Sequence, residues 1–248
     1  MRLRTKKSGF SLTELIVVMS IIGVLAGVGL PAVKQVIKSF ESSDRVKDVV
    51  AAAMSNARAR ALARGKYTGI RFQRDLEGNQ YMVFIESDDT GSAPADGFRP
   101  VIGRNPIRLP KNGLVMDMHL RTAVNNATDP SYVALDSDAQ IDTPQEVTDA
   151  STFCVIFSQA GKLVLRDVRI WKGAGDVFNI DTEVDMGNAM MYIDSYPNEG
   201  LGEETSRNHF VIVDKKLFDA VPDAERWSSY LQYLKPVYVN PYSGEIID

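Results

Sequence analysis

The chain has 248 residues, with 28 basic and 32 acidic side chains and a formal net charge of −4. Cys154 is its one cysteine, which excludes an intrachain disulfide, and alternation in its strand predicts a buried structural thiol. The two histidines, His119 and His209, have neither a local nucleophile nor a metal-ligand spacing, so we assign no catalytic residue and no metal ligand and expect no enzyme.

A basic leader, residues 1–9, precedes an apolar segment over residues 10–33. From Leu15 to Val33 the segment carries no charge, and as a helix it would span about 28 Å, one hydrocarbon core. A cluster of cations precedes the apolar segment, and no equivalent cluster follows it closely. This asymmetry predicts that the N-terminus is cytoplasmic and that the chain after the apolar segment is exported. The leader cations are Arg2, Arg4, Lys6 and Lys7.

A cleaved secretory signal peptide is the alternative interpretation of this segment. Residues 24–26, Val-Leu-Ala, supply a small-residue cleavage pattern. Against it, the apolar stretch is longer than the roughly 7–15 residues of a signal h-region. An acid at the boundary, Glu14, would also have no role in a discarded peptide.

Residues 6–15, KKSGFSLTEL, resemble the type III signal of type IV pilins and type II secretion pseudopilins. The resemblance implies cleavage after Gly9 by prepilin peptidase and N-methylation of Phe10, the new first residue. It also implies that Glu14 pairs with the Phe10 amine of a neighbouring subunit during assembly. Pro31 falls where helices of this family bend or loosen on assembly, and a proline there removes one backbone hydrogen bond.

The position of Glu14 is unusual on physical grounds alone. A lone carboxylate in hydrocarbon is costly, so it either becomes neutral or finds a cation. Pairing with a neighbouring amine would set the axial register of stacked subunits by penalising misaligned ones. The simpler alternative is that Glu14 lies in the headgroup zone and is solvated.

Apolar residues at three- and four-residue steps predict an amphipathic continuation of the helix over residues 34–65. Gly65 is the predicted stop, and cations in the last turns complement the helix dipole. We interpret the three arginines there, Arg58, Arg60 and Arg64, as a solvated helix face and not as a nucleic-acid site. Residues 44–72 resemble the equivalent segment of GspH/FimT-type pseudopilins.

Residues 66–248 are predicted to form one exported domain of short strands. Residues 67–74 and 80–86 flank a polar turn and indicate a hairpin. A second hairpin, 151–158 with 163–171, is similar to the F-x-x-x-G strand-turn pair of the H-type pseudopilins, with Phe157 and Gly161 in those places. Further strands are expected at 107–109, 114–120, 189–193, 210–214 and 236–240.

Two other parts of the domain have their own predictions. Residues 121–150 are polar and aromatic-poor and are interpreted as a surface insertion. Residues 222–234 predict a short amphipathic helix that packs on the sheet. Its apolar face comprises Trp227, Tyr230, Leu231 and Leu234. Residues 173–248 exceed a minimal H-type domain and are interpreted as an extension of the sheet.

The predicted fold class is therefore α+β. A long N-terminal helix, with a membrane-spanning half and an amphipathic half, would pack on an antiparallel β-sheet domain, as the resemblance to pilins implies.

Calcium is the one cofactor that the sequence raises, in the loop from Asp88 to Asp96, which also contains Asp89. The closing bidentate glutamate of an EF-hand is missing there, so solvated turn residues are the preferred interpretation and no cofactor is expected. Subtracting the four leader cations from 28 leaves 24 basic against 32 acidic side chains. An acidic surface and a C-terminal tail without cations argue against nucleic-acid binding.

Together these features predict a minor pilin or pseudopilin, a structural subunit of a type II secretion pseudopilus or a type IV pilus-like filament. The resemblance implies a single-pass protein of the bacterial inner membrane with an extracytoplasmic domain. Its implied partners are prepilin peptidase, other pilin or pseudopilin subunits and the inner-membrane assembly platform. A membrane-anchored binding module that never polymerises is the alternative, followed by an exported enzyme with a cleaved signal.

Overall fold

The protein divides into two compact units, Met1–Glu41 and Ser42–Asp248. The computed structural model describes residues 12, 16–20, 45–74, 77–88, 97–101, 103–121, 132–170 and 203–247. In the first unit, residues 12 and 16–20 are helical. Within these described ranges, no helix has both the length and the apolar character needed to cross a membrane.

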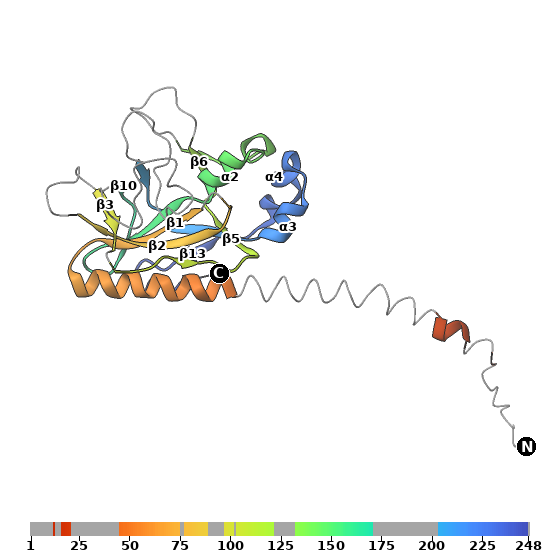
Figure 1. The fold of residues 1–248 in the computed structure, drawn as a ribbon, viewed down its shortest axis with the longest axis horizontal. Helices are drawn as coiled ribbons and strands as arrows, with labels where there is room; N and C mark the ends of the chain where they lie inside the picture. The colour runs from red at the N-terminus through yellow and green to blue at the C-terminus, as the bar shows by residue number, and fades with distance from the viewer. Residues whose placement is uncertain are drawn as a thin grey trace, which may run out of the picture. The chain divides into compact units, whose positions relative to one another are not determined.

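The first element that the structure describes in the second unit is a helix over residues 45–64, drawn in orange in Figure 1 along one side of the β-strands. Its buried side chains recur at three- and four-residue steps, which places them on one face. They are Val46, Val50, Ala53, Met54, Ala57 and Ala61. The helix ends at Gly65, which has a φ of +62° and donates its N–H to the carbonyl of Ala61 at 2.9 Å. A glycine in the left-handed region ends the helix because it has no Cβ to clash.

The larger sheet is built around the predicted first hairpin, which the structure confirms. Strand β1 (Thr68–Arg74) pairs antiparallel with β2 (Gln80–Ser87) and with β8 (Phe153–Phe157). The strand order is β11-β10-β3-β2-β1-β8-β9, and β4 also pairs with β2. The remaining strands are β3 (Gly97–Pro100), β4 (Ile107–Arg108), β9 (Leu163–Val164), β10 (Asp167–Ile170) and β11 (Glu203–Thr205).

The second predicted hairpin is confirmed in part, since β8 pairs antiparallel with β9 across a turn at Gly161. The predicted return strand 163–171 is wrong beyond Val164, because β10 pairs with β3 and β11 instead of β8. One pairing departs from the predicted antiparallel sheet: β10 runs parallel to β3. A parallel pair needs a crossover connection, and β10 is reached from β3 through many intervening elements.

A four-stranded sheet lies beside the first, in the order β14-β13-β12-β5. Its strands are β5 (Gly113–Met116), β12 (His209–Asp214), β13 (Val237–Val239) and β14 (Ile246–Ile247). Strand β12 includes the predicted 210–214, and β13 lies inside the predicted 236–240. Residues beyond 173 therefore do more than extend the first sheet: β11 adds an edge to it, while β12, β13 and β14 pair with β5 to make another. The strand predicted at 189–193 lies outside the described residues.

The main core fills the space between the 45–64 helix and both sheets. Phe72, Phe153 and Phe210 are each at most 1% exposed, and the first two rings stack at 4.7 Å. The helix side chains Met54 and Ala57 belong to the same cluster. Burial of this face holds the helix against the sheets.

A second core contradicts the interpretation of residues 121–150 as a surface insertion, for the part from 132 onward. Leu135, Ile141, Val147 and Ala150 are all at most 6% exposed and pack under β5 and β12. This segment forms β7 (Tyr132–Ala134), η1 (Asp138–Gln140) and α2 (Pro144–Ala150), and β7 pairs with β6 (His119–Arg121). Four apolar side chains spaced among polar ones are enough to bury a segment once a sheet lies beneath them.

Short helices close the same core. The predicted amphipathic helix is divided into η3 (Asp223–Glu225), α4 (Arg226–Ser229) and η4 (Leu231–Tyr233). The backbone leaves helical geometry at Tyr230, with φ −142° and ψ −61°. Its apolar face packs as predicted, with Leu231 fully buried. The sequence did not predict α3 (Lys215–Ala220), whose N-cap Asp214 accepts two backbone N–H groups.

Candidate functional site

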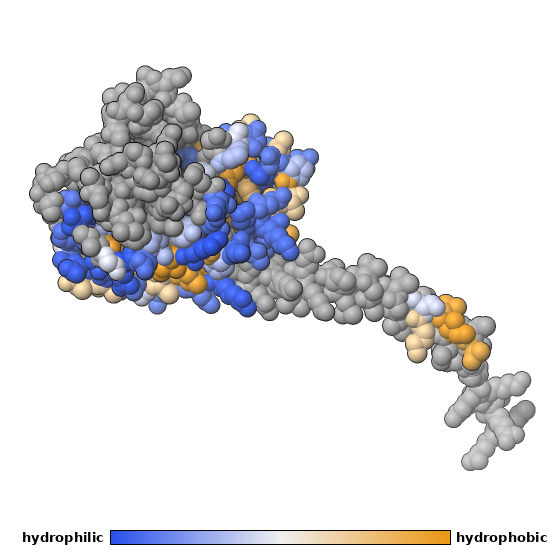
Figure 2. All heavy atoms as spheres, viewed as in Figure 1, coloured by the Kyte–Doolittle hydropathy of each residue, from blue (hydrophilic) through white to orange (hydrophobic). Residues whose placement is uncertain are grey.

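The residues that the sequence predicts to act in processing and assembly, Gly9, Phe10, Glu14 and Pro31, lie outside the described residues. Their described neighbours are apolar and exposed: the exposed fractions are 78% for Leu12 and 48–63% for residues 16–19. Figure 2 shows these residues in orange, as a hydrophobic segment. An apolar surface of this kind is stable only when lipid or protein covers it.

Ser20 shows how a polar residue fits in this apolar segment. Its hydroxyl donates to the carbonyl of Ile16 at 2.8 Å, one helical turn earlier. A serine hydroxyl that is satisfied within its own helix avoids the cost of an unpaired polar group in an apolar medium. The segment is therefore compatible with burial in lipid or among other helices.

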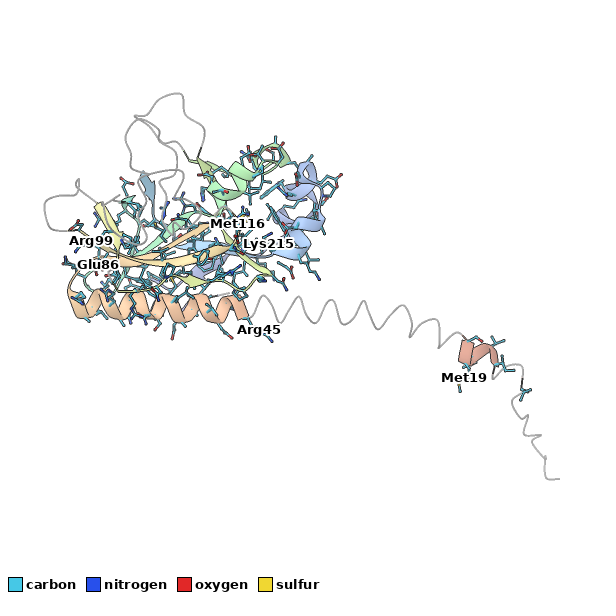
Figure 3. The ribbon with its side chains drawn as sticks, viewed as in Figure 1. Met19, Arg45, Glu86, Arg99, Met116 and Lys215 are labelled. Atoms are coloured by element: carbon cyan, nitrogen blue, oxygen red, sulfur yellow. The ribbon has the colours of Figure 1, made fainter. Side chains whose placement is uncertain are left out.

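The 45–64 helix is fixed to the domain by polar contacts as well as by its buried face. Arg60 Nη2 lies 3.0 Å from Glu86 Oε2 on β2, and Arg58 Nε donates to the carbonyl of Gly161 at 2.9 Å. Figure 3 places Glu86 beside the C-terminal part of the helix. The interpretation of the arginines as a solvated face is therefore wrong for Arg58 and Arg60, which are half-buried, and holds for the exposed Arg64.

The outer face of the helix is a shallow open groove of small side chains with arginines at one end. It is lined by Ala52, Ser55, Asn56, Ala59, Arg60, Ala63, Arg64 and Arg104. Arg104 reaches across to donate to Asn56 at 3.2 Å. Small side chains let another backbone approach closely.

Sequence reasoning missed a buried polar cluster that brings the two histidines together. Asp117 is 2% exposed, and its carboxylate accepts from Arg207 Nε and lies 3.0 Å from His119 Nδ1. The ring of His119 meets that of His209 edge-on at 5.9 Å, and His209 stacks on Tyr238 at 5.5 Å. The residues are far apart in the chain, so no local spacing could have indicated the cluster.

Burial and neighbouring charges set the electrostatics of this cluster. Burial lowers the pKa of His209; Asp117 opposes this shift, while His119 and Arg207 add to it. Asp117 also breaks the predicted strand 114–120 into β5 and β6, because its own N–H donates to the carbonyl of Ala150 at 2.7 Å. Among the residues that the structure describes, no group of three histidine, cysteine or acidic side chains is arranged to hold a metal.

The calcium loop is described only in part, because Asp89 and Asp96 lie outside the described residues. The side chain of Asp88 is 4% exposed, and its Oδ1 lies 3.8 Å from Arg99 Nη1. Cys154 is buried, as predicted, on the β8 face opposite Val155, with the guanidinium of Arg71 3.8 Å from its sulfur.

Comparison with known proteins gives one match. Residues 4–30 match the family profile described as the prokaryotic N-terminal methylation motif. This range contains Gly9, Phe10 and Glu14, and the motif indicates a type IV pilin-like prepilin that is processed at its N-terminus. Searches of curated proteins and of solved structures find no match.

Proposed function

We propose that this protein is a minor pilin or pseudopilin, a structural subunit of a type II secretion pseudopilus or a type IV pilus-like filament. Prepilin peptidase cleaves it after Gly9, and Phe10 becomes the N-methylated first residue. The observation that carries the proposal is the methylation motif over residues 4–30, followed by a helix seated on a β-domain.

The apolar segment gives the proposal its first physical support. Residues 16–19 expose their side chains, and Ser20 satisfies its hydroxyl internally. Such a helix can move from lipid into the core of a filament, since both surroundings cover the same apolar surface. The segment serves as an anchor before assembly and as a packing element afterwards.

The attachment of the 45–64 helix gives the second support. Its buried face, the contact of Arg60 with β2 and the contact of Arg58 with the β8–β9 turn attach the helix to both hairpins. The groove on its outer face remains open to a neighbouring subunit.

The finer assignment follows from the same features. The partners are prepilin peptidase, other pilin or pseudopilin subunits and the inner-membrane assembly platform, and the GspH/FimT-type minor pseudopilins are the group that the chain resembles. The protein is single-pass in the bacterial inner membrane, with its domain outside the cytoplasm. It needs no cofactor and catalyses no reaction.

Mass analysis of the N-terminus, on protein from the membrane fraction, tests the processing step. The expected mature chain begins at N-methylated Phe10. A chain that begins at Gly27 indicates ordinary signal peptidase, and one that retains Met1 indicates an unprocessed anchor. Either result contradicts the proposal.

A charge series at Glu14 tests the assembly step. Glu14→Ala and the isosteric Glu14→Gln should both abolish or misregister incorporation into filaments, because the carboxylate that pairs with the neighbouring amine is gone. Thr13→Ala, a change at the adjacent polar residue, is the matched control and should assemble normally. Undiminished incorporation of Glu14→Gln would refute the register argument. A processed chain that stays monomeric in every variant would favour the anchored binding module.

A further inference from the structure

A basic hollow lies at the end of the domain where the 45–64 helix begins. It is bounded by the β1–β2 turn, by the connection from β4 to β5, and by the start of α3. Four cations and two carboxylates line it: Arg108, Lys111, Lys215, Lys216, Glu77 and Asp219. These six side chains, together with the backbone between them, are called the basic hollow below.

The positive charge of the basic hollow is only partly neutralised. Asp219 pairs with Lys215 at 2.5 Å, and Glu77 accepts from the amide of Asn79 at 3.2 Å. Lys111 and Lys216 are exposed and form no ion pair with any residue that the structure describes. Two lysine ammonium groups are therefore available to an outside anion.

Charges on the rim do not reverse this balance. Asp214 caps α3, its carboxylate accepting from the N–H of Lys216 at 2.9 Å. Arg74 lies near the β1–β2 turn, with its guanidinium against Gly78. A Cβ atom added to Gly78 would lie 2.8 Å from Arg74 Nη2.

The basic hollow lies next to the point where the chain arrives from its N-terminal segment. Gly113 lines the basic hollow and contacts Val46 at the start of the helix. The contact is so close that a Cβ atom added to Gly113 would lie 2.1 Å from Val46 Cγ2. Figure 3 shows Lys215 and Arg45 at the same end of the domain. Eleven residues, 34–44, lie between Val33 at the end of the apolar segment and Arg45, which is twelve residue steps along the chain. They can span about 18 Å as a helix and at most about 43 Å when extended.

We propose that the basic hollow docks on the headgroups of anionic lipids in the membrane that holds the apolar segment. This inference rests on the proposed function, which supplies the anchor and places the domain outside the cytoplasm. A connection of this length allows the hollow to reach the surface. The rest of the exported chain carries an excess of acids, so an anionic surface repels the domain as a whole while it attracts the cations of the basic hollow. The contact holds the domain in one orientation before assembly.

The test uses the full chain, one copy per nanodisc, with a fluorophore on an introduced cysteine. Asn112→Cys marks the basic hollow, and Gln159→Cys, in the exposed β8–β9 turn, marks a distant control position. The native Cys154 is buried, and an otherwise unchanged chain corrects for its labelling. Quenching by a spin label on lipid headgroups reports how near each position comes to the membrane, with phosphatidylcholine alone or with added phosphatidylglycerol.

We expect phosphatidylglycerol to increase quenching at position 112 and not at 159. The double variant Lys111→Gln, Lys216→Gln removes both unpaired positive charges. It should lower the ratio of docked to undocked chains about 25-fold, since each lysine near an anionic surface raises this ratio about five-fold. A matched pair elsewhere, Arg64→Gln with Lys162→Gln, should leave the ratio unchanged. Raising the salt from about 0.15 M to about 1 M should also release the domain, because the screening length falls from about 8 Å to about 3 Å.

Two results would overturn the lipid contact alone. One is an inserted chain whose quenching at position 112 does not respond to phosphatidylglycerol or to the two lysines. The other is obtained in discs that hold two chains, if position 112 cross-links to the second copy and is not quenched by the headgroup label. That result would assign the basic hollow to an acidic segment of a neighbouring subunit. A chain that does not insert into the discs would overturn the anchor, and the proposed function with it.

Discussion

The side chain of Gln80 forms hydrogen bonds that join the two sheets, and its loss should destabilise the domain. The residue begins β2 and is 3% exposed. Its amide donates to the carbonyls of Val115 at 2.7 Å and Ser151 at 2.8 Å, and it accepts the N–H of Val115 at 2.7 Å. Val115 lies on β5, the edge of the four-stranded sheet, so the glutamine takes the place of a missing strand neighbour.

Gln80→Leu keeps the size of the side chain and removes all three hydrogen bonds. The N–H of Val115 is then buried without a partner, which costs about 1–3 kcal/mol, and each of the two carbonyls loses about 0.5–1.5 kcal/mol. Leucine recovers part of this by burying apolar surface, so we expect a loss of about 3 kcal/mol. For a domain of this size that corresponds to a fall of about 6–12 °C in the melting temperature.

Thermal unfolding of the full chain in detergent, followed by tryptophan fluorescence, measures this effect. Trp227 packs on the second core and so reports on the sheet that Gln80 attaches. Gln159→Leu, in the exposed β8–β9 turn, is the matched control and should change stability by less than about 0.5 kcal/mol. A melting temperature for Gln80→Leu within about 2 °C of the unchanged protein would refute the idea that this amide couples the sheets.

Two further predictions concern close packing and pH. Gly113→Ala should destabilise the domain by about 1–3 kcal/mol, because the new methyl group overlaps Val46. Adding Val46→Ala should restore part of this loss. If denaturant titrations show that the two changes have strictly additive effects on stability, the contact is contradicted. Burial lowers the pKa of His209 below its ordinary value of 6.5, so the unfolded chain binds more protons at this residue than the folded chain does. The stability that neutral His209 contributes should therefore be lost as the pH falls through 6.5 towards the lower pKa of the folded state. His209→Phe keeps an aromatic ring against Tyr238. Its melting temperature should fall less between about pH 7.5 and pH 5.5 than that of the unchanged chain. If both melting temperatures change equally with pH, His209 is excluded as a source of acid sensitivity.

Local patterns were sufficient where neighbouring residues alone determine the structure. The turn between residues 74 and 80 predicted the β1–β2 pairing, and the glycine at 161 predicted the β8–β9 turn. Gly65 likewise ended the helix where a residue without Cβ was needed. Each of these features depends on contacts between residues close in the chain.

Patterns failed where a segment is buried by partners that come later in the chain. Residues 132–150 were interpreted as a surface insertion because they are polar, yet Ile141 and Val147 are covered by β12 and the helices after it. The strand predicted at 114–120 breaks at Asp117, whose partner Arg207 arrives 90 residues later. Hydrophobic periodicity has no information about such partners.

The sequence by itself indicated that the N-terminus is processed, since a peptidase acts on a linear segment and the methylation motif lies within residues 4–30. It also determined the amphipathic character of the 45–64 helix. Only the tertiary structure decided that β12 pairs with β5, that Gln80 attaches one sheet to the other, and that the cations of the basic hollow converge beside the start of the helix. The physical reason is the same in each case: these contacts join side chains and backbone groups from distant parts of the chain, and only the packing of the whole domain selects among the possible partners.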